Sequence, residues 1–427
     1  MALTEPLERH LDDIYNKCLH CGLCLPACPT YNLKYNEESS PRGRIQLIHS
    51  VQEGTLQLSD RFVDEMYFCL DCQACETACP AGVRFGELLE ETRNTISENS
   101  REPFGLRLIK RIFLNEILSS PARTKIFASL MRFYQKSGLR NAVEESNILS
   151  LISNNFHEKH KLLPLMDNEP FDETVPEVIT PEGKIRGRVA FLTGCIMNVA
   201  FGRVHRDTIK ILLANGFEVI IPKSQVCCGS LHAHNGEIEE AKRLAKTNIK
   251  IFERYQFDVL VVNSAGCSAF MKEYGRLFHD DGIYSGKAKL FSDKVKEITE
   301  FLIEAGMTKQ PKALSKKITY HEACHLVHTQ KITAQPRQLI NLIPGIEFIE
   351  LPESSWCCGS AGIYNVVRYE ESMEILQRKM NNLESTGADI VLTSNPGCHL
   401  QLQYGIAKKG LKMEVMHPVT LLSESYQ

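Results

Sequence analysis

Sixteen cysteines are the residues of this chain whose number and spacing most directly indicate chemistry. They form four sets of four with none left over, and the first two sets are more compact than the last two. Thiols in a chain without an export signal stay reduced, so the pattern predicts metal ligation. The sets are Cys18, Cys21, Cys24 and Cys28; Cys69, Cys72, Cys75 and Cys79; Cys195, Cys227, Cys228 and Cys267; and Cys324, Cys357, Cys358 and Cys398.

The two compact sets are copies of one motif, CLHCGLCLPACP at 18–29 and CLDCQACETACP at 69–80. In C-x2-C-x2-C-x3-C-P, three thiolates reach one 4Fe-4S cubane and the fourth ligates the other cluster. Structural zinc is the alternative, but it leaves the third and fourth cysteines unexplained. The sequence therefore predicts two clusters, one held by Cys18, Cys21, Cys24 and Cys79, and one held by Cys69, Cys72, Cys75 and Cys28.

The two wider sets belong to an internal repeat. Corresponding cysteines are offset by 129, 130, 130 and 131 residues, and GRVAFLTGC parallels KKITYHEAC in the surrounding sequence. Two homologous half-domains explain this pattern. Each set of four thiols can bind a further cluster, form a disulfide or hold zinc, and the sequence leaves these alternatives open. The candidate ligands are Cys195, Cys227, Cys228, Cys267, Cys324, Cys357, Cys358 and Cys398.

Histidines lie beside both wide sets, and a role as ligands or as hydrogen-bond donors to cluster sulfur is slightly favoured over ordinary core or surface positions. They are His321, His325 and His328 around Cys324, and His232 and His234 after the first CCG.

Arg42 and Arg44, in PRGR between the compact motifs, are interpreted as partners in salt bridges at a helix end, with tuning of a cluster's potential as the alternative. No nucleotide-binding or hydrolase motif is convincing, so we expect no catalytic residue in this chain.

The segments around these residues indicate their scaffold. Residues 1–100 read as an α-helical ferredoxin domain, because IQLIHSV continues as a helix between the two motifs. Residues 101–187 read as a helical segment and linker. Its amphipathic helices over 103–136 are basic, with a solvated face over the core as the favoured interpretation, and membrane or partner docking as alternatives.

The repeat reads as two α/β half-domains, 188–312 and 313–427. Short apolar runs alternate with amphipathic helices, which indicates βαβ units and parallel sheets. The cysteines of the first half follow predicted strands, and the carboxyl edge of such a sheet is where ligands bind. The predicted fold class is therefore multidomain α+β, a helical ferredoxin domain followed by two parallel-sheet halves.

Composition limits the partners and the location. The 427 residues contain 49 basic and 52 acidic side chains, so no global field recruits nucleic acid. No apolar run has the roughly 20 residues needed to span a bilayer, and the N-terminus lacks a secretory signal. We expect a cytoplasmic protein, with peripheral association on the inner face of the cell membrane as the alternative.

The cysteine pattern of the halves resembles the CCG domain of heterodisulfide reductases, except that Phe270 and Gln401 replace the last cysteine of the expected CxxC. The whole chain, with PRGR, GCSAFMKEYG at 266–275 and CCGSAGIY at 357–364, resembles the iron-sulfur subunits of glycolate oxidase. The missing fifth thiolates argue against a heterodisulfide-reductase-like enzyme.

This resemblance implies a complex in which partner subunits carry FAD and oxidise glycolate or a related 2-hydroxy acid such as D-lactate. The chain itself would pass electrons through its clusters toward a membrane quinone. The alternatives are the corresponding subunit of an anaerobic glycerol-3-phosphate or lactate-utilisation dehydrogenase, a heterodisulfide-reductase-like enzyme, and a zinc-binding scaffold without redox chemistry.

Overall fold

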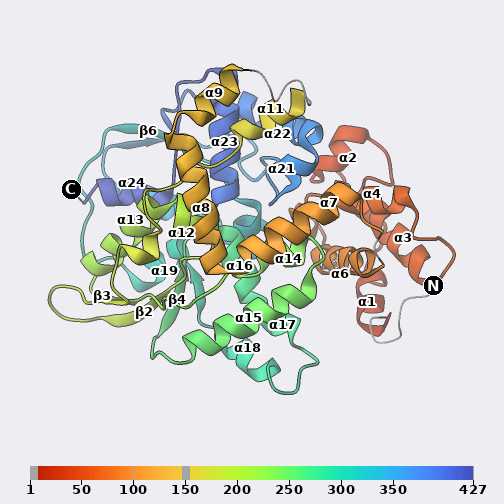
Figure 1. The fold of residues 1–427 in the computed structure, drawn as a ribbon, viewed down its shortest axis with the longest axis horizontal. Coiled ribbons are helices and arrows are strands. Elements are labelled where there is room, and N and C mark those ends of the chain that lie inside the picture. Colours follow the sequence, from red (N-terminus) through yellow and green to blue (C-terminus); the bar gives the residue numbers. More distant parts are fainter. Residues whose placement is uncertain (1–7, 100, 147–153, 427) are drawn as a thin grey trace.

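The computed structural model describes residues 8–99, 101–146 and 154–426 (Figure 1). The N-terminal module is helical, and the predicted helix between the two motifs is present as α3. Ser40 starts α3, because its Oγ accepts a hydrogen bond from Gly43 N at 3.0 Å and Pro41 fits the first turn. The helices are α1 (Glu8–Tyr15), α2 (Pro29–Lys34), α3 (Pro41–Gln52), α4 (Asp60–Phe68), α5 (Ala74–Thr77) and α6 (Phe85–Glu98).

The second segment is also helical, and its helices are interrupted at Ser119 and Ser120, with Ser120 capping the helix that begins at Pro121. Residues 147–153 of the predicted linker lie outside the described residues. The elements are α7 (Phe104–Ile109), the π-helix η1 (Lys110–Leu118), α8 (Pro121–Lys136), α9 (Leu139–Glu145), α11 (Asn154–Lys161) and the 3-10 turn η2 (Phe171–Glu173).

The first half-domain has a sheet in the order β1-β3-β2-β4-β5. Strands β2 to β5 are parallel, as predicted, whereas the short β1 pairs antiparallel with β3. The strands are β1 (Val178–Ile179), β2 (Gly187–Phe191), β3 (Phe217–Ile220), β4 (Val259–Val262) and β5 (Val295–Glu297). The helices are α12 (Ile196–Ala200), α13 (Gly202–Ala214), α14 (Ser230–His234), α15 (Ile238–Phe252), α16 (Ala265–Lys272), α17 (Tyr274–Leu277), α18 (Ser285–Ser292) and α19 (Ile298–Ala305).

The second half-domain repeats this arrangement with a parallel sheet in the order β7-β6-β8-β9. Its strands are β6 (Lys316–Tyr320), β7 (Ile346–Phe348), β8 (Ile390–Leu392) and β9 (Glu414–Met416). Its helices are η3 (His325–Thr329), α20 (Ala334–Asn341), α21 (Tyr364–Val367), α22 (Tyr369–Thr386), α23 (Pro396–Lys409) and α24 (Pro418–Glu424).

One hydrophobic core joins the two half-domains. Side chains from β2 and β3 of the first half and from β6 and β8 of the second belong to the same buried cluster, with Phe191, Val219, Ile318 and Leu392 nearly inaccessible to solvent. The structure confirms the predicted fold class. The predicted domain boundaries at 100, 187 and 312 stay predictions.

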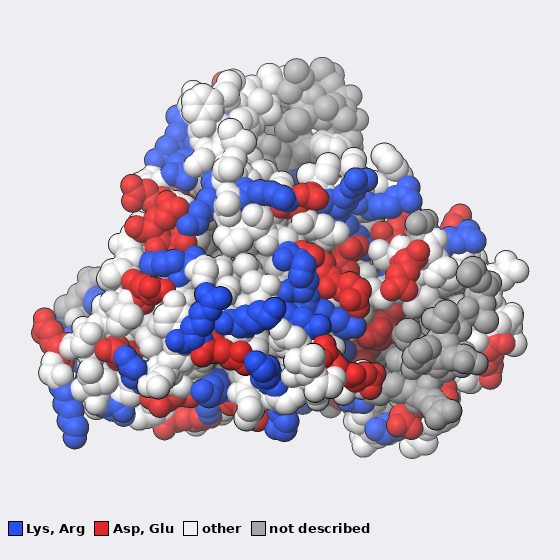
Figure 2. Space-filling model, turned by 60° about the horizontal axis from the view of Figure 1, so that its bottom comes forward, with Lys and Arg blue, Asp and Glu red and all other residues white. Residues whose placement is uncertain are grey.

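Charges of both signs are mixed on the surface. In Figure 2, Lys and Arg side chains lie next to Asp and Glu over the visible face. Within the described residues, no helix combines the length and the apolar character needed to cross a bilayer.

Candidate functional site: four cysteine sets

The fourth cysteine of the first motif lies with the second motif, as crossed ligation requires. Burial raises the pKa of the Cys69, Cys72 and Cys75 thiols, and Cys28 is close enough to each of them for its charge to raise the pKa further. Thiols in such a place favour a metal partner, because binding a cation replaces the costly buried anion with a neutralised thiolate. Four cysteines that a cluster could use are therefore already assembled.

The first three cysteines of the N-terminal motif lie nearer the surface. Cys21 is exposed, while burial raises the pKa of Cys24 to about 11. Cys18 and Cys79 pack against the same hydrophobic cluster of the N-terminal module. This placement fits the predicted cluster 1, with one ligand open to solvent.

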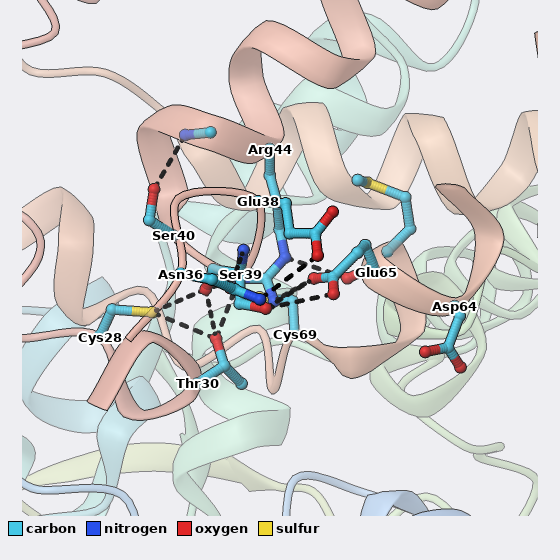
Figure 3. A network of polar contacts seen from close by, with 12 residues as sticks. Cys28, Thr30, Asn36, Glu38, Ser39, Ser40, Arg44, Asp64, Glu65 and Cys69 are labelled. Atoms are coloured by element: carbon cyan, nitrogen blue, oxygen red, sulfur yellow. Dashed lines mark hydrogen bonds and ion pairs between the residues drawn. The ribbon is translucent and has the colours of Figure 1, made fainter. Parts of the chain in front are cut away.

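A buried arginine lies beside Cys28 and Cys69, two of the predicted ligands of cluster 2 (Figure 3). Arg44 is fully buried and donates hydrogen bonds to Thr30 Oγ1 at 3.0 Å and to the Ser39 carbonyl at 2.9 Å. Its charge opposes the rise in the pKa of Cys69 that burial causes. Arg44 also forms a salt bridge with Glu65, as the favoured interpretation expected, and it places positive charge beside the predicted ligands.

Arg42 behaves as the favoured interpretation expected. Its Nε lies 2.6 Å from Glu37 Oε1, and its Nη1 donates to the His20 carbonyl at 2.8 Å. His20 lies between Cys18 and Cys21, so Arg42 holds the cluster 1 loop from the protein surface.

The first CCG set converges at the carboxyl edge of its sheet. Cys195 follows β2, Cys227 and Cys228 follow β3, and Cys267 lies on the helix after β4. The sulfurs of Cys195 and Cys227 are 3.5 Å apart. Hydrogen bonding with Cys195 and Cys228, and then with His232, holds the pKa of Cys227 well below its ordinary value.

The second CCG set converges in the same way. Hydrogen bonds link the thiols in a row, from Cys324 to Cys357, from Cys357 to Cys358 and from Cys358 to Cys398. Burial also raises the pKa of the Cys324, Cys357 and Cys358 thiols. In both half-domains the first and last cysteines of the set follow the strands on either side of the point where the strand order reverses, β2 and β4 or β6 and β8. Ligand sites of open α/β sheets occur at such points.

The glycine of each CCG motif is required by the turn. Gly229 and Gly359 have φ values of +90° and +87°. A Cβ on Gly359 would lie 2.6 Å from the carbonyl oxygen of Ser372 on the neighbouring helix. Only glycine turns the chain there and lets the helix approach the cysteines.

The N-terminal module meets the second CCG set directly. Cys324 lies near enough to Cys72 to raise the pKa of the Cys72 thiol, and Cys72 raises the pKa of Cys357 in the same way. Both effects are smaller than those of burial and hydrogen bonding. Leu70, Cys72 and Cys357 share one small hydrophobic cluster. The predicted cluster 2 and the second CCG set are therefore neighbours.

A buried ionic network lies at this junction, and the sequence analysis did not find it. His234 Nδ1 is 2.7 Å from Glu90 Oε1 and 3.0 Å from Asp71 Oδ2. Arg276 reaches the other oxygen of Glu90 at 2.7 Å. Burial alone would lower the pKa of His234, but the two carboxylates raise it to about 10. The network is a set of compensated charges, which ties the ferredoxin loop to the first half-domain.

The other histidines that the sequence singled out have two kinds of surroundings: two bond to the ferredoxin loop, and two lie beside cysteines. His325 Nε2 lies 2.9 Å from the Asp71 carbonyl, and His328 Nδ1 lies 3.1 Å from Thr77 Oγ1, so both fasten η3 to the ferredoxin loop. His232 lies beside Cys227, and His321 lies with Cys358 and Cys398. The sequence analysis singled out all five histidines, and among these five His232 and His321 are the two whose rings lie beside cysteine sulfur.

Comparisons with known families agree with this arrangement. The cysteine-rich domain family matches residues 189–272 and 318–403, and the 4Fe-4S dicluster domain family matches residues 14–83. Residues 105–163 match the linker region of the glycolate oxidase iron-sulfur subunit. These matches confirm the two CCG repeats and the prediction that the chain carries iron-sulfur clusters.

Known proteins similar to most of the chain carry related names. A probable glycolate oxidase iron-sulfur subunit of Bacillus subtilis is 38% identical over 413 residues, covering 96% of this chain and 93% of that protein. The glycolate oxidase iron-sulfur subunit of Escherichia coli is 29% identical, covering 94% of each chain. Lactate utilization protein A of Bacillus licheniformis is 31% identical over 238 residues, covering 55% of this chain and 99% of that protein.

Proposed function

The chain belongs to the family of glycolate oxidase iron-sulfur subunits, and from that premise we propose that it is the electron-transfer subunit of a flavin-dependent 2-hydroxy-acid dehydrogenase. FAD-binding partner subunits oxidise glycolate, or D-lactate, and this chain receives the electrons. A membrane quinone is the final acceptor. D-lactate is included as a candidate substrate because lactate utilization protein A is among the similar proteins.

The observation that carries the proposal is the place of Cys28, the last cysteine of the first motif, beside Cys69, Cys72 and Cys75 of the second motif. It supports two clusters held by crossed ligation of the two motifs, so that electrons would pass between them without a mobile carrier. When bound, the clusters supply one-electron transfer. The proposed ligands are Cys18, Cys21, Cys24 and Cys79 for cluster 1, and Cys69, Cys72, Cys75 and Cys28 for cluster 2. The CCG cysteines hold at least one further centre.

The chain's own residues set the environment of these centres. Buried positions exclude water, and backbone N–H groups point at sulfur, as Asp71 N does toward Cys69 Sγ at 3.4 Å and Gly359 N toward Cys357 Sγ at 3.4 Å. Such bonds favour the reduced, more negative state of a cluster. No residue of the chain is assigned to hydride removal, which belongs to the partner flavin, so the isolated chain should not turn over glycolate.

The proposal is tested by anaerobic purification of the chain with and without its co-expressed flavoprotein subunits. Glycolate, D-lactate and glycerol 3-phosphate are added in turn, and cluster reduction is followed by EPR and by loss of visible absorbance. We expect reduction by a 2-hydroxy acid only in the complex. Reduction of the isolated chain, or reduction of the complex by glycerol 3-phosphate alone, would refute the proposal.

Attachment to the inner face of the cell membrane is supported by α7, η1 and α8, which lie on the near side in Figure 1. The expected solvated face over the core is only partly present, because two apolar stripes at helical spacing point outward. Exposed basic side chains border them. The stripe residues are Phe104, Leu108 and Ile112, and Ile126, Leu130 and Phe133; the basic residues are Arg107, Arg111, Arg123 and Lys136. Apolar side chains beside arginines suit an anionic lipid surface.

Flotation with vesicles of anionic phospholipid tests this attachment. Leu130→Glu with Phe133→Glu should abolish co-flotation, whereas Ile283→Glu with Leu290→Glu, at exposed apolar side chains elsewhere, should not. If only the flavoprotein subunits, and not the vesicles, bind the wild type through this face, the surface is a protein interface and the membrane proposal fails.

A further inference from the structure

The two CCG halves differ at one buried position beside the cysteines. His321 stands three residues before Cys324, and the residue three before Cys195 in the first half is Leu192. Both side chains are buried, with exposed fractions of 1% and 2%. The repeat therefore has an imidazole at this position in its second half only, whereas the histidine of the first half, His232, lies beside Cys227.

His321 is turned toward sulfur rather than toward a hydrogen-bond partner. One ring nitrogen, Cys358 Sγ and Cys398 Sγ all lie within 4.8 Å of one another. Neither ring nitrogen has a hydrogen-bond partner at normal distance among the described residues. An unpaired buried imidazole costs free energy that a metal bond would recover.

The types of these donors, thiols and one imidazole, suit a single zinc-class ion. In a tetrahedral site with bonds of about 2.3 Å to sulfur and about 2.0 Å to nitrogen, donor atoms lie about 3.5 to 3.8 Å apart. The three donor atoms, all within 4.8 Å of one another, are close enough to converge on one such ion. Cys357, which hydrogen-bonds with Cys358, is the next thiol and completes four donors.

The charge of the surroundings also fits. Lys379 is fully buried on α22, and its Nζ donates to the backbone carbonyls of Glu353 and Ser354 at 2.5 and 3.2 Å. Burial lowers the pKa of Lys379 to about 8, and the thiols of Cys358 and Cys357 oppose this shift. Three thiolates and a neutral imidazole around a divalent cation carry one negative charge, which the Lys379 ammonium balances.

We propose that the second half-domain holds a single tetrahedral divalent ion of the Zn²⁺ class through His321, Cys357, Cys358 and Cys398. The ion is structural, because four protein donors leave no open position. It ties the end of β6 and the CCG loop after β7 to helix α23, which follows β8, beside the ferredoxin loop. The further redox centre of the CCG region then belongs to the first half, where Leu192 supplies no donor. This inference is independent of the substrate of the complex.

The test is metal analysis of the full chain, expressed with both iron and zinc in the medium and purified anaerobically. We expect about one zinc per chain, with zinc X-ray absorption showing about three sulfur neighbours and one nitrogen neighbour. His321→Leu, which installs the residue of the first half, should lower zinc retention by about tenfold or more and leave iron unchanged. His328→Gln, at a histidine of the same segment that contacts Thr77 instead, should retain the zinc.

A second variant keeps the test decisive if His321→Leu does not fold. His321→Cys should retain zinc but change the absorption spectrum to four sulfur neighbours. Absence of zinc from the wild type, a spectrum without a nitrogen neighbour, or loss of iron in place of zinc in His321→Leu would each overturn the proposal. None of these readouts depends on activity with glycolate, so they are separate from failure of the proposed function.

Discussion

Arg44 Nη2 lies 3.3 Å from Glu65 Oε2 in a pocket closed to solvent beside Cys28 and Cys69. The Ser39 hydroxyl donates to the same carboxylate at 3.1 Å. The pair therefore brings a cation and an anion together next to the predicted cluster 2. Removing either member leaves the other as an uncompensated buried charge, and it also changes the charge that the cluster experiences.

Replacing Arg44 by Met should destabilise the N-terminal module strongly. Breaking a buried pair costs about 3–5 kcal/mol, because Glu65 stays buried without its partner. Arg42→Met is the matched control, since its ion pair with Glu37 is exposed to solvent and such pairs contribute little to stability. Urea unfolding followed by circular dichroism measures both variants. Equal losses in the two would contradict the importance of burial.

Glu65→Gln should raise the reduction potential of cluster 2. The change removes a negative charge while Arg44 keeps its positive one, which stabilises the more negative reduced cluster. Redox titration followed by EPR should show the shift in one cluster signal only. A lowered potential, or a shift confined to cluster 1, would show that the pair does not lie where we place it.

Crossed ligation predicts which variants resemble one another. Cys28→Ser should alter the same EPR signal as Cys72→Ser, although Cys28 belongs to the first motif in sequence. Cys79→Ser should match Cys21→Ser by the same reasoning. If Cys28→Ser matches Cys21→Ser instead, each motif holds its own cluster.

Much of the fold was predictable because it depends on local signals. The repeat offsets, the turn at Pro41 and the apolar runs before Cys195 and Cys267 specify α3, the parallel sheets and the cysteines at the strand ends. Strand β1 was missed, because two residues in a proline-bearing segment carry no periodicity.

Some features of the site depend on tertiary packing and could not be predicted. Lys379 has the appearance of an exposed helix residue, and only packing of α22 on the second sheet buries it. Asp71, Glu90 and His234 come from three distant segments, and no local signal pairs them.

Gly359→Ala should disturb the second CCG turn. A left-handed conformation costs a non-glycine residue about 1–2 kcal/mol, and the Cβ would also collide with the Ser372 carbonyl at 2.6 Å. Gly410→Ala is the control, because Gly410 has φ +70° and nothing lies within 4 Å of its Cβ position. We expect Gly359→Ala to lose more stability than Gly410→Ala in thermal unfolding. Similar melting temperatures would mean that the helix simply moves away.

Stability should fall in mild acid because buried histidines of the shared core are neutral. His417 Nε2 lies 3.1 Å from the Asn263 carbonyl, and the Asn263 amide donates to His205 Nδ1 at 3.0 Å. Burial lowers the pKa of His417 to about 3 and that of His205 to about 4. Between these values and the ordinary pKa of about 6.5, the unfolded chain binds protons that the folded chain does not.

The contribution of these histidines to stability is full above about pH 6.5 and is lost as the pH falls toward their pKa values in the folded protein. At pH 5 each histidine should cost about 2 kcal/mol. His417→Asn removes one titration and retains an oxygen that can cap α24, as His417 Nδ1 does by accepting from Val419 N. Urea midpoints at pH 7.5, 6 and 5 should therefore decline less steeply in the variant, even if it is less stable at pH 7.5. Parallel declines in variant and wild type would show that His417 titrates normally in the fold.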